Sequence, residues 1–169
     1  MDRLTRLFYR ILIGLACVSM AAAFVIVLLG ILARQVTFIN IQGLDAYAGY
    51  AIAAAFFFAL PTALMHGDHI RVTLLLDRLD SRLRAVFEWA GLFAGLGLSG
   101  YMAWFAVRAV WLSYETHDVS PAADATPLWI PQLCMAIGCT AFALAFLDAI
   151  VARLRGREWF IEGPGSVAE

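Results

Sequence analysis

The chain has 169 residues, of which 63% are hydrophobic and 15% are charged, and its mean hydropathy is +0.81. Soluble domains carry about 25% charged residues, so this composition excludes an ordinary soluble protein and indicates a chain surrounded by lipid. The formal net charge is −1. The basic residues are all arginines in short clusters, without the dense basic stripe that nucleic-acid binding needs, so we expect no nucleic-acid partner.

Four uncharged stretches predict four transmembrane helices. Residues 11–33, 46–65, 89–107 and 128–147 contain no Asp, Glu, Lys, Arg or His. As helices rising 1.5 Å per residue they are each about 30 Å long, the thickness of a hydrocarbon core. With their interfacial flanks, the expected spans are about 11–33, 46–65, 89–112 and 127–150.

The N-terminal segment also has features of a secretory signal peptide. Arg3, Arg6 and Arg10 precede an apolar run that contains three consecutive alanines at 21–23. The apolar run continues to Ala33, which is longer than the apolar region of a signal peptide. A first membrane span is therefore the favoured interpretation.

The distribution of arginines predicts the orientation of the spans. Ten of the twelve arginines lie in the N-terminal segment, the connection after the second span and the C-terminal segment. The two others, Arg34 and Arg108, lie on the opposite side. Because positive charge is retained in the cytoplasm, we expect both termini to be cytoplasmic.

The connection between the second and third spans predicts an amphipathic helix at about 69–87. Its apolar residues recur at helical spacing, opposite Arg78 and Arg82. We expect this helix to lie in the cytoplasmic interface of the membrane; the alternative is a solvated helix packed on the ends of the spans. The whole is then an all-α integral membrane protein, with a single membrane domain at 1–160 and a flexible tail at 161–169.

Two local features have structural consequences. Thr126 is the expected N-cap of the fourth span, with Pro127 as its first helical residue. Pro61 has no N–H to donate to the carbonyl of Phe57, and predicts a bend in the second span.

Small residues recur every four positions in two of the spans, which predicts close helix packing. The rows are candidate interfaces with a larger partner; packing within the chain is an equally good interpretation. The row in the second span is Ala51, Ala55, Ala59 and Ala63, and the row in the third is Gly91, Gly95, Ser99 and Ala103.

The pattern contains no recognisable catalytic, metal or cofactor site, so we expect no enzyme and no cofactor. Cys134 and Cys139 lie five residues apart inside one span, where small packing residues are expected, and His117 lies in the outer connection. The uncharged centres of the spans lack the ionisable groups that carriers use at the membrane midplane. The chain is therefore not expected to move a charged substrate alone.

Two sequence runs are distinctive. The first is His66-Gly67-Asp68-His69-Ile70-Arg71-Val72-Thr73-Leu74-Leu75, and the second extends from Ser120-Pro121 to Thr126-Pro127-Leu128-Trp129-Ile130-Pro131. Together with the four spans, they resemble the small membrane subunit, with four transmembrane helices, of tripartite ATP-independent periplasmic (TRAP) transporters. The residues that carry the resemblance most directly are His69, Arg71, Val72, Pro127, Trp129 and Pro131.

This resemblance implies an accessory subunit in the bacterial inner membrane. In that family a large multi-span subunit moves an organic acid by ion-driven, elevator-type symport, a periplasmic solute-binding protein delivers the acid, and the small subunit joins the immobile scaffold. Outer residues that would help to dock the binding protein are Arg34, Asp45, Arg108 and Glu115. Two alternatives stay open: the small subunit of a tricarboxylate tripartite transporter, and a self-associating structural protein.

Overall fold

The computed structural model describes residues 3–35, 43–65, 81–121 and 125–155, and these residues form four long helices. The helices are α1 (Arg3–Gln35), α2 (Leu44–Met65), α4 (Ser81–Glu115) and α5 (Trp129–Leu154). All four are long and apolar enough to cross a bilayer, over Thr5–Gln35, Leu44–Met65, Ala85–Glu115 and Trp129–Leu154. This confirms the prediction of an all-α chain with four helices of membrane-spanning length and composition.

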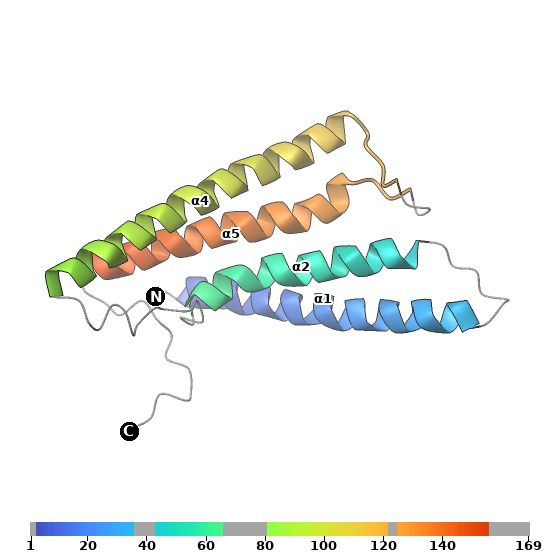
Figure 1. Cartoon of the computed structure of the whole chain (residues 1–169), viewed down its shortest axis with the longest axis horizontal. Helices are drawn as coiled ribbons and strands as arrows, with labels where there is room; N and C mark the ends of the chain where they lie inside the picture. The colour runs from blue at the N-terminus through green and yellow to red at the C-terminus, as the bar shows by residue number, and fades with distance from the viewer. Residues whose placement is uncertain (1–2, 36–42, 66–80, 122–124, 156–169) are drawn as a thin grey trace, which may run out of the picture.

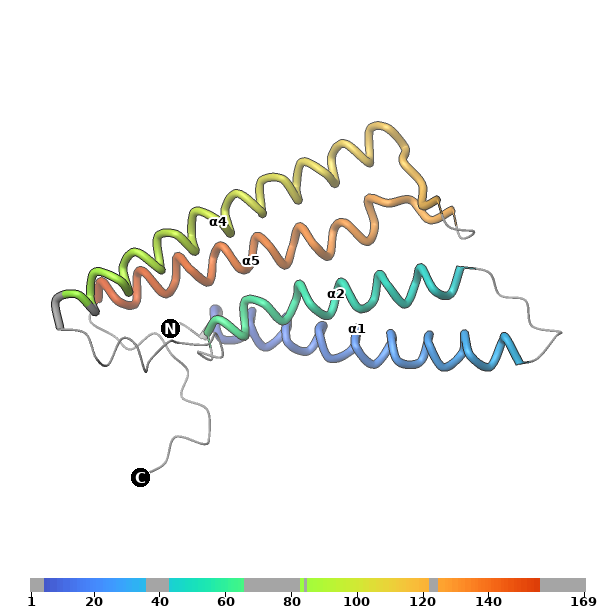
Figure 2. The backbone as a smooth tube through the Cα atoms, viewed as in Figure 1, coloured from blue at the N-terminus to red at the C-terminus, as the bar shows by residue number. Residues whose placement is uncertain are grey.

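The helices lie side by side in the order α1, α2, α5, α4 (Figure 1). α1 packs against α2, α4 packs against α5, and the contact between α2 and α5 joins the two hairpins. The first residues of α1 and the last residues of α5 lie at the same end of the row, called here the terminal end (Figure 2). The opposite end, where α1 and α4 finish and α2 and α5 begin, is called the distal end.

The helices extend beyond the uncharged stretches. α1 begins at Arg3. α4 begins at Ser81, whereas the third span is expected to begin only at residue 89. No Gly or Pro occurs between Ser81 and Trp89, so nothing in the local sequence stops the helix there. Residues 81–87, predicted as the end of a separate interfacial helix, are instead the first turns of α4; residues 69–80 lie outside the described part of the chain.

The core is built from small residues of α5. Ala145 and Ala149 are fully buried and Ala141 is 1% exposed, and they face residues of α1 and α2. Alanines let neighbouring helices approach closely, which is the main source of packing energy between helices in lipid. The larger side chains packed around them are Tyr9, Leu12, Phe58, Leu64, Met65, Leu92, Phe146 and Ile150.

The two edge helices are far more exposed than the two central ones. In the most apolar stretch of each helix, 17% of the residues of α1 and α4 are buried, against 39% of those of α2 and α5. The difference follows from the row, because an edge helix has a neighbour on one side. Lipid or a partner protein must therefore cover the free sides of α1 and α4.

The two hairpins are in close backbone contact at Gly138 of α5. A methyl carbon added there would lie 2.5 Å from the carbonyl oxygen of Phe57 and 2.7 Å from its carbonyl carbon. Four residues after Phe57 stands Pro61, which has no N–H to donate to that oxygen. α2 nevertheless continues to Met65, and the backbone of α5 lies directly against the segment that Pro61 alters.

We expect Gly138→Ala to destabilise the chain by about 1 to 3 kcal/mol, because the added methyl group meets backbone atoms that cannot rotate away. The matched control is Gly49→Ala, since an added methyl carbon there meets no atom within 4 Å. Denaturant titration of the purified chain in mild detergent, followed by circular dichroism, measures both. Equal midpoints for the two variants would contradict the close contact at Gly138.

Candidate functional site

The small-residue row of the third span lies mostly within the chain. An added methyl carbon at Gly95 would collide with the ring of Phe146, and Ser99 is 1% exposed. Ala103 packs against the cluster of Ala106, Ala136 and Cys139. Gly91 is exposed and has open space around it. Three of the four residues are therefore occupied by contacts in the same molecule, which disfavours self-association through this row.

The small-residue row of the second span also contains both buried and partly exposed residues. Ala55 is buried, whereas Ala51, Ala59 and Ala63 are partly exposed. Ala59 packs against the main core cluster. Contact of either row with another protein is not tested by these observations and stays a prediction.

A polar cluster at the terminal end joins three helices, and nothing in the sequence pattern predicts it. The hydroxyl of Tyr9 on α1 donates a hydrogen bond of 3.0 Å to Oδ2 of Asp148 on α5. The hydroxyl of Thr62 on α2 donates to the main-chain oxygen of Tyr9 over 3.5 Å. Asp148 follows the last uncharged residue of its span, and only the folded chain brings Tyr9 beside it.

A second polar contact joins α4 to α5 near the same end. Arg153 forms an ion pair with Glu88, and both side chains are at least three-quarters buried. The guanidinium carbon of Arg153 also lies 5.5 Å from the ring centre of Trp89, in the position of a cation–π contact. With Tyr9 and Asp148, these residues fasten the ends of the helices where the uncharged spans stop.

The distal end carries the residues predicted to dock a binding protein. Nη2 of Arg34 lies 2.8 Å from Oδ2 of Asp45, so these two side chains pair with each other between α1 and α2. Both are largely exposed, at 72% and 85%. Glu115 and Arg108 are exposed on α4. The four residues thus do not form one cluster: Arg34 and Asp45 make a pair on the α1–α2 hairpin, and the other two lie on the α4–α5 hairpin.

The connection from α4 to α5 is held by main-chain hydrogen bonds. Val119 and Pro127 form an isolated antiparallel bridge. The N–H of Ser120 donates to the oxygen of Thr126 at 2.8 Å, and the N–H of Leu128 donates to the oxygen of Asp118 at 3.0 Å. These contacts place the two sides of the connection beside each other at the distal end.

The predicted N-cap at Thr126 is wrong. α5 begins at Trp129, its N-cap residue is Leu128, and no side chain caps it. The hydroxyl of Thr126 instead donates to the hydroxyl of Tyr47 on α2 at 3.0 Å. A bond to the neighbouring hairpin thus takes the place of the local cap, and sequence spacing alone does not reveal it.

Of the two sequence runs that resemble TRAP small subunits, most of the second lies among the described residues. Pro127 lies in the bridge, and Trp129 opens α5 with its ring edge-on to that of Tyr114, at 5.9 Å between centres. Pro131 lies in the first turn of α5, where its missing N–H removes no intrahelical bond. His69, Arg71 and Val72 lie outside the described residues.

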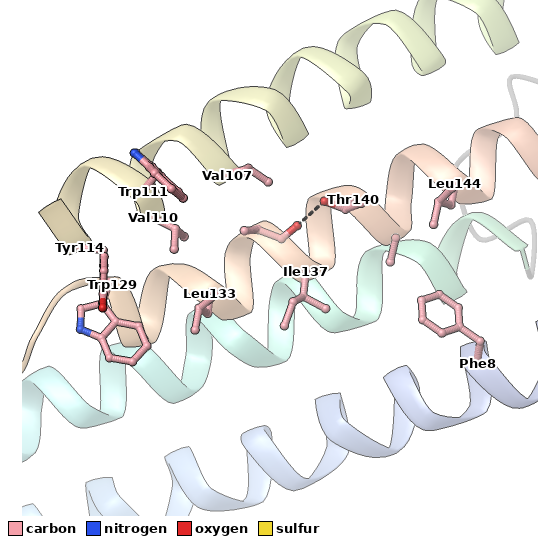
Figure 3. Close-up of a pocket in the computed structure, with 12 residues that line it drawn as sticks. Phe8, Val107, Val110, Trp111, Tyr114, Trp129, Leu133, Ile137, Thr140 and Leu144 are labelled. Atoms are coloured by element: carbon pink, nitrogen blue, oxygen red, sulfur yellow. Dashed lines mark hydrogen bonds between the residues drawn. The ribbon is translucent and has the colours of Figure 1, made fainter.

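An apolar groove of about 580 Å³ runs along α4 and α5. Figure 3 shows its lining side chains, from Trp129 and Tyr114 at the distal end to Leu144 and Phe8. All the lining residues are uncharged, and the hydroxyl of Thr140 is bonded to the oxygen of Ala136 in its own helix at 2.7 Å. The groove is chemically suited to apolar groups and not to a charged substrate. Across the described ranges, no three or more His, Cys, Asp or Glu side chains are grouped as they would be around a metal ion.

Comparison with known proteins identifies the family of the chain. A family model described as the DctQ component of tripartite ATP-independent periplasmic transporters matches residues 23–156. The chain belongs to this family. Its members are subunits of a transporter and not enzymes, and the match favours the TRAP system over the tricarboxylate alternative.

One curated relative is the C4-dicarboxylate TRAP transporter small permease protein DctQ of Rhodobacter capsulatus. It is 29% identical to this chain over 82 residues, which are 48% of this chain and 36% of that protein. The aligned part therefore covers little more than a third of the relative. No solved structure matches the chain.

The Tyr9–Asp148 bond gives a test of the terminal cluster. We expect Tyr9→Phe to lower the free energy of unfolding by about 1 to 2 kcal/mol, because the Asp148 carboxylate loses its donor while remaining partly buried. Tyr101→Phe is the matched control, since that ring is 63% exposed. Denaturant titration in detergent compares them; Asp148→Asn, which keeps an acceptor oxygen, should lose less than Asp148→Leu. Equal stability of Tyr9→Phe and Tyr101→Phe would contradict a stabilising bond.

Proposed function

We propose that this chain is the accessory scaffold subunit of an ion-gradient-driven TRAP transporter that imports an organic acid. It enlarges and anchors the immobile part of a large elevator-type membrane subunit, and a periplasmic binding protein delivers the solute. The observation that carries the proposal is the family match over residues 23–156, on a chain whose four spanning helices have uncharged centres. Without ionisable groups at the midplane, the chain has no means of binding a coupling ion or an acid there.

An organic acid is the proposed class of substrate. The name of the Rhodobacter capsulatus relative refers to C4-dicarboxylates. The apolar groove along α4 and α5 has no charged lining residue with which to hold a carboxylate. The substrate site is accordingly assigned to the large subunit, and the identity of the acid has to be determined on that partner.

The proposed location is the bacterial inner membrane, with both termini in the cytoplasm. The four spans return the chain to the side on which it started, and ten of its twelve arginines fall in the segments assigned to that side. The terminal end then faces the cytoplasm and the distal end faces the periplasm. Aromatic residues Trp111 and Trp129 near the distal end fit the position of an interfacial belt.

The distal charges are proposed to help dock the binding protein. Arg34, Asp45 and Glu115 lie at helix ends, where a periplasmic protein can reach them. Arg108 lies seven residues before Glu115, about 10 Å along the helix and closer to the membrane, so the docking proposal is restricted to the other three residues. Exposed charges of this kind steer association more than they add to its affinity.

Co-purification tests the subunit proposal. The C-terminally tagged chain, extracted from native membranes in mild detergent, is expected to recover one much larger multi-span protein in about equal amount, identified by mass spectrometry. An unrelated tagged four-helix membrane protein of the same host is the control for non-specific recovery. Repeated recovery of this chain alone, across several detergents, would contradict the accessory role.

Charge reversal tests docking. We expect Arg34→Glu and Glu115→Arg each to lower binding-protein-dependent uptake about threefold or more at low salt, with a smaller difference at high salt, because screening weakens exposed charges. Arg155→Glu is the control, since Arg155 is exposed at the terminal end. Uptake unchanged by both distal variants at both salt concentrations would remove these residues from the docking surface.

A further inference from the structure

The free side of α4 carries polar groups at a depth where lipid offers them no partner. Tyr101 lies within one residue of the middle of the 31-residue span Ala85–Glu115, and its side chain is 63% exposed. Trp104 follows one turn later and is 69% exposed. Tyrosine and tryptophan at a lipid surface normally lie at the two interfaces, where their polar atoms reach water. Tyr101 lies in the middle of the span instead, and Trp104 lies three residues, about 5 Å, closer to its distal end.

The hydroxyl of Tyr101 and the indole N–H of Trp104 are not satisfied within the described part of the chain. The ring of Tyr101 contacts that of Phe105, but neither polar atom forms a hydrogen bond to a described residue. The hydrocarbon core extends about 15 Å on each side of the midplane, farther than the side chain of Tyr101 can reach from the middle of the span. An unsatisfied donor in hydrocarbon is costly, so the hydroxyl of Tyr101 needs an acceptor from another molecule, and the same acceptor surface can extend to the indole N–H of Trp104.

Arg108 continues the same side of the helix. It lies nine residues after buried Ser99, which is about two and a half helical turns and therefore the opposite side of α4. α4 is an edge of the row (Figure 1). Since α5 covers the Ser99 side of α4, helix geometry places Arg108 on the side away from the other helices.

Arg108 has no anionic partner among the residues that the structure describes. Asp45, at the distal end of α2, is paired with Arg34. Glu88, near the terminal end of α4, is paired with Arg153. Glu115 is on the same side of α4, but about 10 Å away along the helix. An arginine beside an apolar span is stabilised when a carboxylate or another fixed negative charge lies next to it.

Gly97 completes this surface, which is called here the α4 flank and consists of Gly97, Tyr101, Trp104 and Arg108. All four residues are exposed, and a methyl carbon added at Gly97 meets no atom within 4 Å. A glycine there allows the backbone of another helix to approach closely. Tyrosine, tryptophan and arginine are also the residues that most often dominate the energy of protein interfaces.

We propose that the α4 flank is the surface that binds the large membrane subunit, which supplies acceptor oxygens to Tyr101 and Trp104 and a carboxylate to Arg108. This inference rests on the proposed function and assigns the partner to one side of one helix. Acyl chains are excluded as the occupant at Tyr101 and Trp104, because they carry no acceptor. A lipid phosphate meets the needs of Arg108 but not those of Tyr101 at the middle of the span.

Photo-crosslinking in the co-expressed complex tests the location. Benzoylphenylalanine replaces Trp104 in one variant and Phe24 in another; Phe24 is 65% exposed on α1, the opposite edge of the row. After irradiation, the variant at position 104 is expected to form a covalent adduct with the large subunit, and the variant at position 24 is not. An adduct from position 24 with none from position 104 would overturn the assignment to α4.

Co-purification of substituted chains tests the chemistry. Arg108→Glu is expected to lower recovery of the large subunit at least tenfold, Arg108→Lys less than threefold, and the pair Tyr101→Phe with Trp104→Phe about threefold or more. The control is Tyr114→Phe, which keeps an exposed ring of α4 near the distal end. Undiminished recovery of the large subunit with Arg108→Glu would overturn the proposal. If Arg108→Glu instead destabilises the isolated chain in phospholipid vesicles and leaves recovery unchanged, Arg108 contacts a lipid headgroup, and the proposal is likewise overturned. If the unsubstituted chain recovers no large subunit, the proposed function itself fails.

Discussion

Close backbone contact between α2 and α5 is the constraint on which the arrangement of the four helices depends. Gly138 leaves no room for a side chain against Phe57, and Ala145 and Ala149 are fully buried against α1 and α2. Lipid provides little hydrophobic driving force between helices, so such close packing must join the α1–α2 hairpin to the α4–α5 hairpin. As a result the helices form a row. The two central helices, α2 and α5, are covered on both sides, and the two edge helices, α1 and α4, are exposed on one side.

Polar groups complete this scaffold at its ends and leave its centre uncharged. Tyr9 with Asp148 and Arg153 with Glu88 fasten the terminal end, and Arg34 with Asp45 pairs the helices of one hairpin at the distal end. A carrier needs the reverse arrangement, with ionisable groups or broken helices at the midplane. The arrangement of this chain supports the proposal that it is a fixed support and that the transported acid and its coupling ion bind to a partner. This division agrees with membership of the DctQ component family.

The sequence was sufficient for the spans and insufficient for the contacts between them. Absence of charge locates a span because a bilayer penalises any ionised residue, a local property that needs no knowledge of the fold. The pairing of Tyr9 with Asp148, 139 positions apart, and the bond from Thr126 to Tyr47 depend on helix order, which periodicity does not encode. Regular four-residue spacing draws attention to the rows in the second and third spans, but spacing alone does not show that Gly138 and the buried alanines of α5 form the close contact between the hairpins. Similarly, the apolar periodicity over about 69–87, opposite Arg78 and Arg82, predicts a helix lying in the interface, whereas residues 81–87 are the first turns of α4.

Reconstituted transport tests the central claim most directly. Proteoliposomes containing this chain, the large subunit or both are supplied with the binding protein, a labelled organic acid identified by its binding to that protein, and an inward ion gradient. The account predicts uptake with both subunits, little uptake with the large subunit alone and none with this chain alone. Uptake by this chain alone, or full uptake by the large subunit in its absence, would contradict the role of an indispensable but non-transporting scaffold.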